Sequence, residues 1–119
     1  MVSRLSKGAL QKLLSGKVKQ PARVVVKFYN NGCHYCHELK EDFEQIAADD
    51  KSERLFFAFN VDDYPAVQDI LNFQGVPTIC AMKVGDSKPK IKVMPEPEKP
   101  NKDTWYNTSE IKLFIEAEQ

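Results

Sequence analysis

The stretch ARVVVKFYNNGCHYCH, residues 22–37, holds the pattern that decides the fold. Its first half, residues 22–29, is mostly apolar and β-branched, which predicts a strand buried on both faces of a sheet. Residues 30–32 (NNG) predict a turn. Apolar residues recur at helical spacing from Cys33 onward. The stretch therefore predicts two cysteines at the start of a helix that follows a buried strand.

The rest of the chain alternates between strand and helix patterns, which is typical of βαβ units. Within the short helix expected at residues 66–73, the inward-facing side chains should be Val67, Ile70 and Leu71. The other expected elements are a helix over residues 5–16 that stops at Gly16, a strand over 55–61, a hairpin of strands 79–84 and 90–94, and a last helix with its N-cap at Asn107.

Length and composition predict one domain over residues 1–119, with an exposed proline-rich loop at residues 95–106. The 17 Lys and Arg residues balance the 17 Asp and Glu residues, so no nucleic-acid partner is expected. Residues 1–20 lack a continuous apolar stretch, which argues against a secretory signal or a membrane span and predicts a cytoplasmic protein. Three cysteines do not make a secreted disulfide framework, so the thiols are expected to serve chemistry.

A Cys-x-x-Cys motif at a helix start places two sulfur atoms close enough to bridge. The first, Cys33, lies where unpaired backbone N–H groups and the helix dipole favour a thiolate, so we expect it to be the nucleophile. Cys36 lies one turn further, on the apolar face, and is expected to resolve a mixed disulfide formed by Cys33. The pair should exchange dithiol and disulfide.

Together with residues 75–78 (GVPT) before a strand and hairpin, this arrangement resembles the thioredoxin family over residues 24–84. The resemblance implies a thioredoxin fold, an α/β architecture with a central mixed sheet of about four to five strands flanked by helices. Its first strand, near residues 2–5, should be short or absent. Pro77 would be a cis proline beside the cysteines, and the backbone of Val76 would bind an extended substrate chain.

The resemblance also implies a thiol-disulfide oxidoreductase acting on protein disulfide substrates. No cofactor is expected, the electron donor would be thioredoxin reductase or glutathione, and the protein should be a monomer that binds neither nucleic acid nor a membrane. A glutaredoxin-like use of glutathione is the alternative within the oxidoreductases, suggested by Tyr35 and by Val76-Pro77.

The chain departs from the family pattern beside the cysteines. Gly32 stands where the family has a tryptophan, Lys27 where it has a buried acid, and Ala58 where it has the accompanying lysine. We expect a buried Lys27 to stabilise the thiolate and make the pair more oxidising. In the alternative to this burial, the Lys27 side chain extends to the sheet edge and its ammonium lies in water.

Two further side chains could affect the pair. His34 lies inside the motif, where an imidazolium would favour the Cys33 thiolate, although an exposed histidine of little effect is the alternative. His37, which follows the motif, is a weaker candidate for the same role. Cys80 falls in the middle of an expected strand and should be a small buried hydrophobic residue.

Three other interpretations of the function remain open from the sequence. Residues 33–37 satisfy the Cys-x-x-Cys-His pattern for covalent haem attachment, but leave GVPT unexplained. Cys33, Cys36 and the histidines could bind zinc or an iron-sulfur cluster, although no second Cys-x-x-Cys completes the set. The fold could also be an interaction module whose contact surface is the loop at residues 95–106, where Trp105 and Tyr106 could make the contact.

Overall fold

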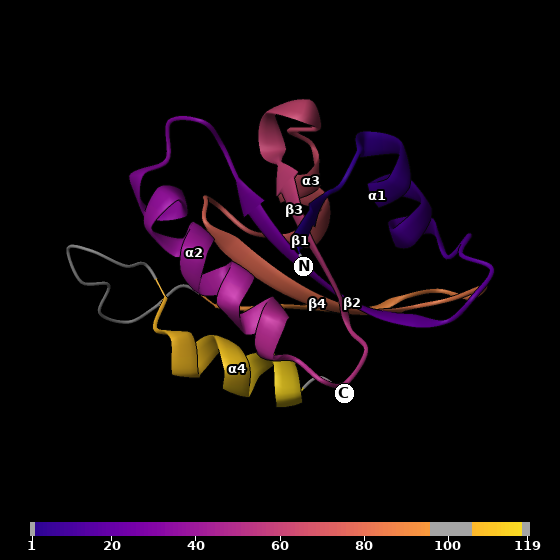
Figure 1. Cartoon of the computed structure of the whole chain (residues 1–119). Coiled ribbons are helices and arrows are strands. Elements are labelled where there is room, and N and C mark those ends of the chain that lie inside the picture. Colours follow the sequence, from indigo (N-terminus) through magenta and orange to yellow (C-terminus); the bar gives the residue numbers. More distant parts are fainter. Residues whose placement is uncertain (1, 96–105, 118–119) are drawn as a thin grey trace.

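The computed structural model describes residues 2–95 and 106–117, and it contains a five-stranded mixed sheet with the order β1-β3-β2-β4-β5 (Figure 1). β2 pairs in parallel with β3 and antiparallel with β4, so it is the central strand. The strands are β1 (Val2–Arg4), β2 (Ala22–Tyr29), β3 (Leu55–Asn60), β4 (Thr78–Val84) and β5 (Lys90–Val93). The helices are α1 (Lys7–Ser15), α2 (His34–Asp49), the 3₁₀ turn η1 (Val61–Asp63), α3 (Val67–Leu71) and α4 (Thr108–Ala117).

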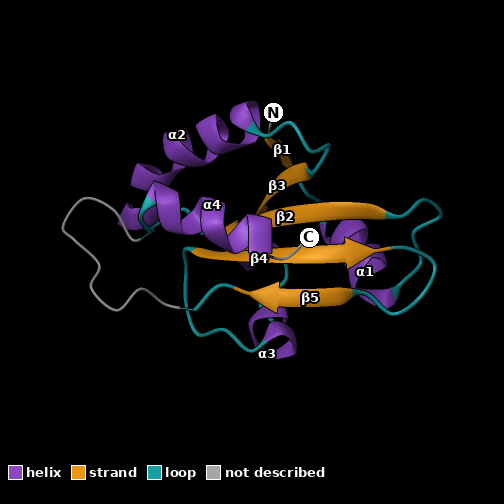
Figure 2. Cartoon of the chain, turned by 90° about the horizontal axis from the view of Figure 1, so that it is seen from below, coloured by secondary structure: helices purple, strands orange, loops and turns teal. Residues whose placement is uncertain are grey.

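The sheet separates two apolar cores, because successive side chains of a strand point to opposite faces. Figure 2 shows α2 and α4 on the near face of the sheet and α1 and α3 behind it. On β2, Val24, Val26 and Phe28 pack with the side chains of α1 and α3, whereas Val25 packs with those of α2 and α4. The alternation therefore directs Lys27 toward the α2 face.

The thioredoxin-like architecture expected from the sequence is confirmed. The strand predicted at residues 22–29 is β2, and the first strand is present but only three residues long. Gly16 ends α1 in the left-handed conformation, with φ 73°. No helix in the described part of the chain is long and apolar enough to cross a membrane.

Two helix predictions need correction. α1 begins after Leu5, because the Ser6 hydroxyl accepts a hydrogen bond from the Ala9 N–H at 3.1 Å and caps the helix there. Ile70 is 53% exposed instead of inward. A helix turns by about 100° per residue, and in the short α3 only the stripe of Val67 and Leu71 reaches the sheet, which leaves Ile70 at the solvent margin.

Tyr106 is not a contact surface. It is 1% exposed and packs in the core beneath α4, where its hydroxyl donates a hydrogen bond to the Met94 carbonyl at 3.4 Å. Its burial follows from its place beside the Asn107 cap, which accepts a hydrogen bond from the Ser109 N–H at 2.9 Å and fixes the start of α4. Trp105 and the remainder of the proline-rich loop, residues 96–105, lie outside the described residues.

Candidate redox site

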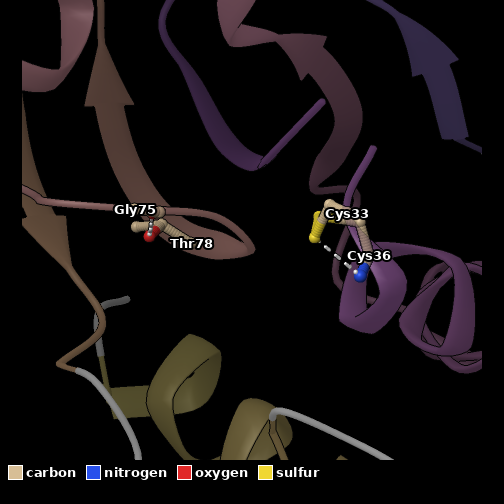
Figure 3. Close-up of a disulfide and its surroundings, with 4 residues drawn as sticks. All are labelled: Cys33, Cys36, Gly75 and Thr78. Atoms are coloured by element: carbon tan, nitrogen blue, oxygen red, sulfur yellow. Dashed lines mark hydrogen bonds between the residues drawn. A yellow bond between two sulfur atoms is a disulfide. The ribbon is translucent and has the colours of Figure 1, made fainter. Parts of the chain in front are cut away.

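The two cysteines of the motif form a disulfide at the N-terminus of α2 (Figure 3). Cys33 is the N-cap residue, with extended backbone angles (φ −88°, ψ 109°), and its sulfur accepts a hydrogen bond from the Cys36 N–H at 3.0 Å. The Cα atoms are 5.2 Å apart, within the range that a disulfide spans. Cys33 is partly exposed, whereas Cys36 is 5% exposed and faces the core. Of the two residues, Cys33 is therefore the more accessible to solvent.

The turn before Cys33 is tied to the end of β3. The buried Asn60 side chain donates a hydrogen bond from Nδ2 to Asn31 Oδ1 at 3.2 Å, and its Oδ1 accepts another from the Asp62 N–H at 3.0 Å. One amide therefore positions both the turn and η1. Asn60 was not predicted from the sequence, because nothing in the spacing of the chain indicates which turn an asparagine at a strand end will contact.

The loop between Gly75 and Thr78 extends toward the disulfide (Figure 3). The Val76–Pro77 peptide bond is cis, Pro77 is buried and Val76 is half-buried. The Thr78 hydroxyl donates a hydrogen bond to the Gly75 carbonyl at 2.6 Å, which fixes the loop at the start of β4. The fold therefore brings the second motif of the sequence to the first.

Lys27 is buried beneath α2 instead of reaching the sheet edge. It is 5% exposed, and its ammonium lies 5.4 Å from the centre of the Phe43 ring and 5.9 Å from that of Tyr29. Burial lowers the pKa of Lys27, although the charge of Glu44 acts in the opposite direction. On the neighbouring strand β3, Ala58 is its register partner.

Lys27 and Cys36 line the same cavity of about 510 Å³. The cavity lies between the start of the chain, the end of β2 and the first turns of α2, and its lining also includes Arg4, Lys40 and Glu44. Lys27 and the cysteines were predicted from the sequence, but this cavity was not, because β1 and α2 are far apart in the sequence and meet only in the fold.

His34 is exposed on the first turn of α2, where its ring lies edge-on to that of Tyr35 with centroids 5.6 Å apart. His37 is also exposed and lines the cavity. Cys80 is fully buried in β4, and burial raises the pKa of its thiol. The described residues contain no cluster of three or more His, Cys, Asp or Glu side chains arranged to hold a metal ion.

Several solved structures share this fold. Chloroplastic thioredoxin z has a TM-score of 0.68 and 19% identity, with 98% of this chain and 92% of that chain covered. The Malassezia sympodialis thioredoxin Mala s 13 has a TM-score of 0.66 and 15% identity, with 99% and 90% covered. A mutant thioredoxin from Halobacterium salinarum has a TM-score of 0.65 and 17% identity, with 98% and 88% covered. No curated protein matches the sequence.

The family model named Thioredoxin matches residues 7–102, which include the disulfide, the buried Lys27 and the loop of Val76 and Pro77. A match of that extent covers most of the chain and goes beyond likeness of fold. The Cys33–Cys36 pair, already at bonding distance, gives the chain the redox group that thiol-disulfide exchange requires. The protein belongs to the thioredoxin family and is a thiol-disulfide oxidoreductase.

Proposed function

We propose that the protein exchanges dithiol and disulfide with other proteins, with Cys33 as the nucleophile and Cys36 as the resolving thiol. The observation that carries the proposal is the difference in exposure of the two sulfur-bearing residues, because Cys33 is partly exposed while Cys36 is buried behind it. A bulky protein substrate can therefore approach Cys33 alone.

The reaction proceeds in two exchanges. The Cys33 thiolate attacks one sulfur of the substrate disulfide, which forms a mixed disulfide and releases the other substrate sulfur as a thiolate. The Cys36 thiolate then attacks Cys33 Sγ and displaces the second substrate thiolate. Two electrons have moved to the substrate, and the enzyme holds the Cys33–Cys36 disulfide. The two released thiolates take up protons according to the pH.

The loop beside the disulfide supplies the substrate groove in this proposal. The Val76 backbone binds an extended substrate segment in the manner of an added strand, and Pro77 forms the floor. The position of this loop opposite the disulfide supports the assignment.

A trapping experiment tests the two cysteine roles. The Cys36→Ser variant should accumulate mixed disulfides with lysate proteins through Cys33, because the resolving step is removed. Cys80→Ser is the matched control and should trap nothing, since wild-type resolution remains. Equal trapping by Cys33→Ser and Cys36→Ser would contradict the assignment.

The electron donor is proposed to be thioredoxin reductase, with glutathione as the alternative. Insulin reduction should proceed with NADPH and thioredoxin reductase and be slower with glutathione and its reductase. The reverse ranking would favour glutaredoxin-like chemistry. We further propose that the protein works in the cytoplasm, which fractionation of the source cells would test.

Lys27 is proposed to stabilise the thiolate of the reduced pair and to raise its reduction potential. The burial of Lys27 and the cavity that it shares with Cys36 support this role. Lys27→Met should shift the midpoint of the alkylation rate of Cys33 to higher pH and make the potential more negative by about 30 mV, a tenfold change in the equilibrium constant. The exposed Lys83→Met is the control. Coincident curves for wild type and Lys27→Met would remove Lys27 from the mechanism.

His34 is proposed to act on the same thiolate from the solvent side. The His34→Gln variant should alkylate more slowly than wild type, because it removes the imidazole beside Cys33. His37→Gln, which changes the other exposed histidine of α2, should have a smaller effect.

A further inference from the structure

The cavity behind Cys36 has an unbalanced charge. Its lining contains the cationic side chains of Arg4, Lys27 and Lys40 and one carboxylate, Glu44. Arg4 is partly neutralised by an exposed ion pair with Asp63 at 3.3 Å, whereas Lys40 is exposed. The cavity as a whole is positive and attracts small anions.

Lys27 lacks an acceptor in this cavity. Among the described residues, no oxygen lies within ion-pair or hydrogen-bond distance of its ammonium, and aromatic rings are its near neighbours. A largely buried charge that no protein acceptor pairs with is unfavourable. An anion in the cavity would supply the missing acceptor.

The other walls match an organic ligand. Ser3, Asn30 and Asn31 offer hydroxyl and amide groups, while Tyr29 and Ala58 offer carbon surface. A volume of about 510 Å³ exceeds what a single inorganic oxyanion fills and lies in the range of small-molecule sites. We propose that this cavity binds a small organic carboxylate, which pairs with Lys27 behind the redox-active disulfide.

Binding at this place is coupled to the redox state of the cysteines. In the disulfide form neither sulfur carries a charge, but reduction leaves a thiolate on Cys33, next to Cys36 in the cavity wall, and this thiolate repels a bound carboxylate and competes with it for Lys27. The carboxylate therefore binds the disulfide form more tightly than the dithiol form. Linkage then requires the ligand to make the reduction potential more negative. This coupling rests on the proposed redox function, whereas binding to the disulfide form does not.

Calorimetric titration of the disulfide form with succinate tests the site directly. One succinate should bind per chain, and its neutral analogue succinamide should not bind. Lys27→Met should weaken binding at least about tenfold, because the buried cation is lost, while Lys83→Met should bind as wild type. Absence of succinate binding, or equal binding by Lys27→Met, would overturn the site. Inorganic phosphate that binds as tightly as succinate would overturn the assignment to organic carboxylates.

The coupling has its own measurement. Succinate should bind the dithiol form about tenfold more weakly than the disulfide form. At saturating succinate, a tenfold ratio of the two dissociation constants lowers the reduction potential of the pair by about 30 mV. Equal affinity of the two forms would overturn the coupling. Insulin reduction is measured separately without succinate, so loss of that activity counts against the proposed function, and loss of succinate binding counts against the cavity.

Discussion

Lys27 is a charged residue in a largely apolar environment. It stands on the central strand β2, and its burial lowers its pKa below the ordinary value of 10.5. The unfolded chain therefore binds this proton more tightly than the folded chain. The folded state carries a penalty at neutral pH, and this penalty disappears as the pH rises from the lowered folded pKa toward the unfolded value.

A first prediction follows for the disulfide form of Lys27→Met. The variant should be more stable than wild type at pH 7 by about 1 kcal/mol, because methionine fills similar space without a buried charge. The gain should shrink as the pH rises toward the unfolded lysine value of about 10, since the folded wild-type chain loses this proton before the unfolded chain does. Urea unfolding at both pH values measures this, with Lys83→Met as the control. A gain in stability that grows with pH would contradict the lowered pKa of Lys27.

At the residue scale, the sequence predicted those groups whose role depends on local spacing. Cys33 and Cys36 follow from one turn of helix, and the burial of Cys80 follows from its place in a strand. Asn60 and the cavity at Lys27 could not be predicted, because each depends on which distant segments meet. The misassigned Tyr106 shows the same limit, since it stands at the end of a proline-rich loop in the sequence while its contacts are in the core.

Among the elements, α1 shows how a glycine sets a helix end. Gly16 has φ 73°, and a Cβ atom there would lie 2.8 Å from the carbonyl carbon of Ser87. Both the backbone angle and the space therefore favour glycine. The sequence predicted this stop correctly, because glycine after an amphipathic stretch is a common end signal, but it placed the start too early by including Leu5.

Two alanine variants of α1 give the second prediction. Gly16→Ala should destabilise the protein by at least about 1 kcal/mol, since the left-handed conformation is strained for alanine and Ser87 must move. Gly8→Ala is the matched control, because nothing lies within 4 Å of its Cβ position in the first turn of the same helix. That change should stabilise by up to about 1 kcal/mol. Thermal or urea unfolding compares them, and equal effects would contradict the argument.

For the molecule as a whole, a partly buried ionic cluster connects α2, β3 and β2 at the end of the sheet away from the disulfide. Arg54 pairs with Asp50 at 2.6 Å and donates to Ser52, whose carbonyl accepts a hydrogen bond from Arg23 on β2. Burial alone would raise the pKa of Asp50, but the hydrogen bond from Ser52 and the charge of Arg54 outweigh it and hold the pKa below its ordinary value. The carboxylate therefore stabilises the fold above the unfolded pKa.

The third prediction concerns acid. The contribution of Asp50 should be lost as the pH falls through its lowered folded pKa, because the unfolded chain then binds a proton that the folded chain resists. Asp50→Asn should cost about 1–2 kcal/mol near neutral pH, because the pair is only partly buried and Arg54 is left with an uncharged partner. The cost should shrink near pH 3. Unfolding free energies of both proteins from about pH 7 to pH 3 measure this, and a constant difference would contradict it.

Cys80 is a built-in probe of how often the sheet opens. Its thiol is fully buried in β4, in register with Val26 on β2 and Val93 on β5. Thiol reagents can reach it only when these strands separate. With the redox pair kept as a disulfide, the rate at which a reagent labels Cys80 reports how often the sheet opens at its centre. The same chain thus carries one pair of cysteines that exchanges electrons with other molecules and a third cysteine whose labelling rate reports the opening of the core.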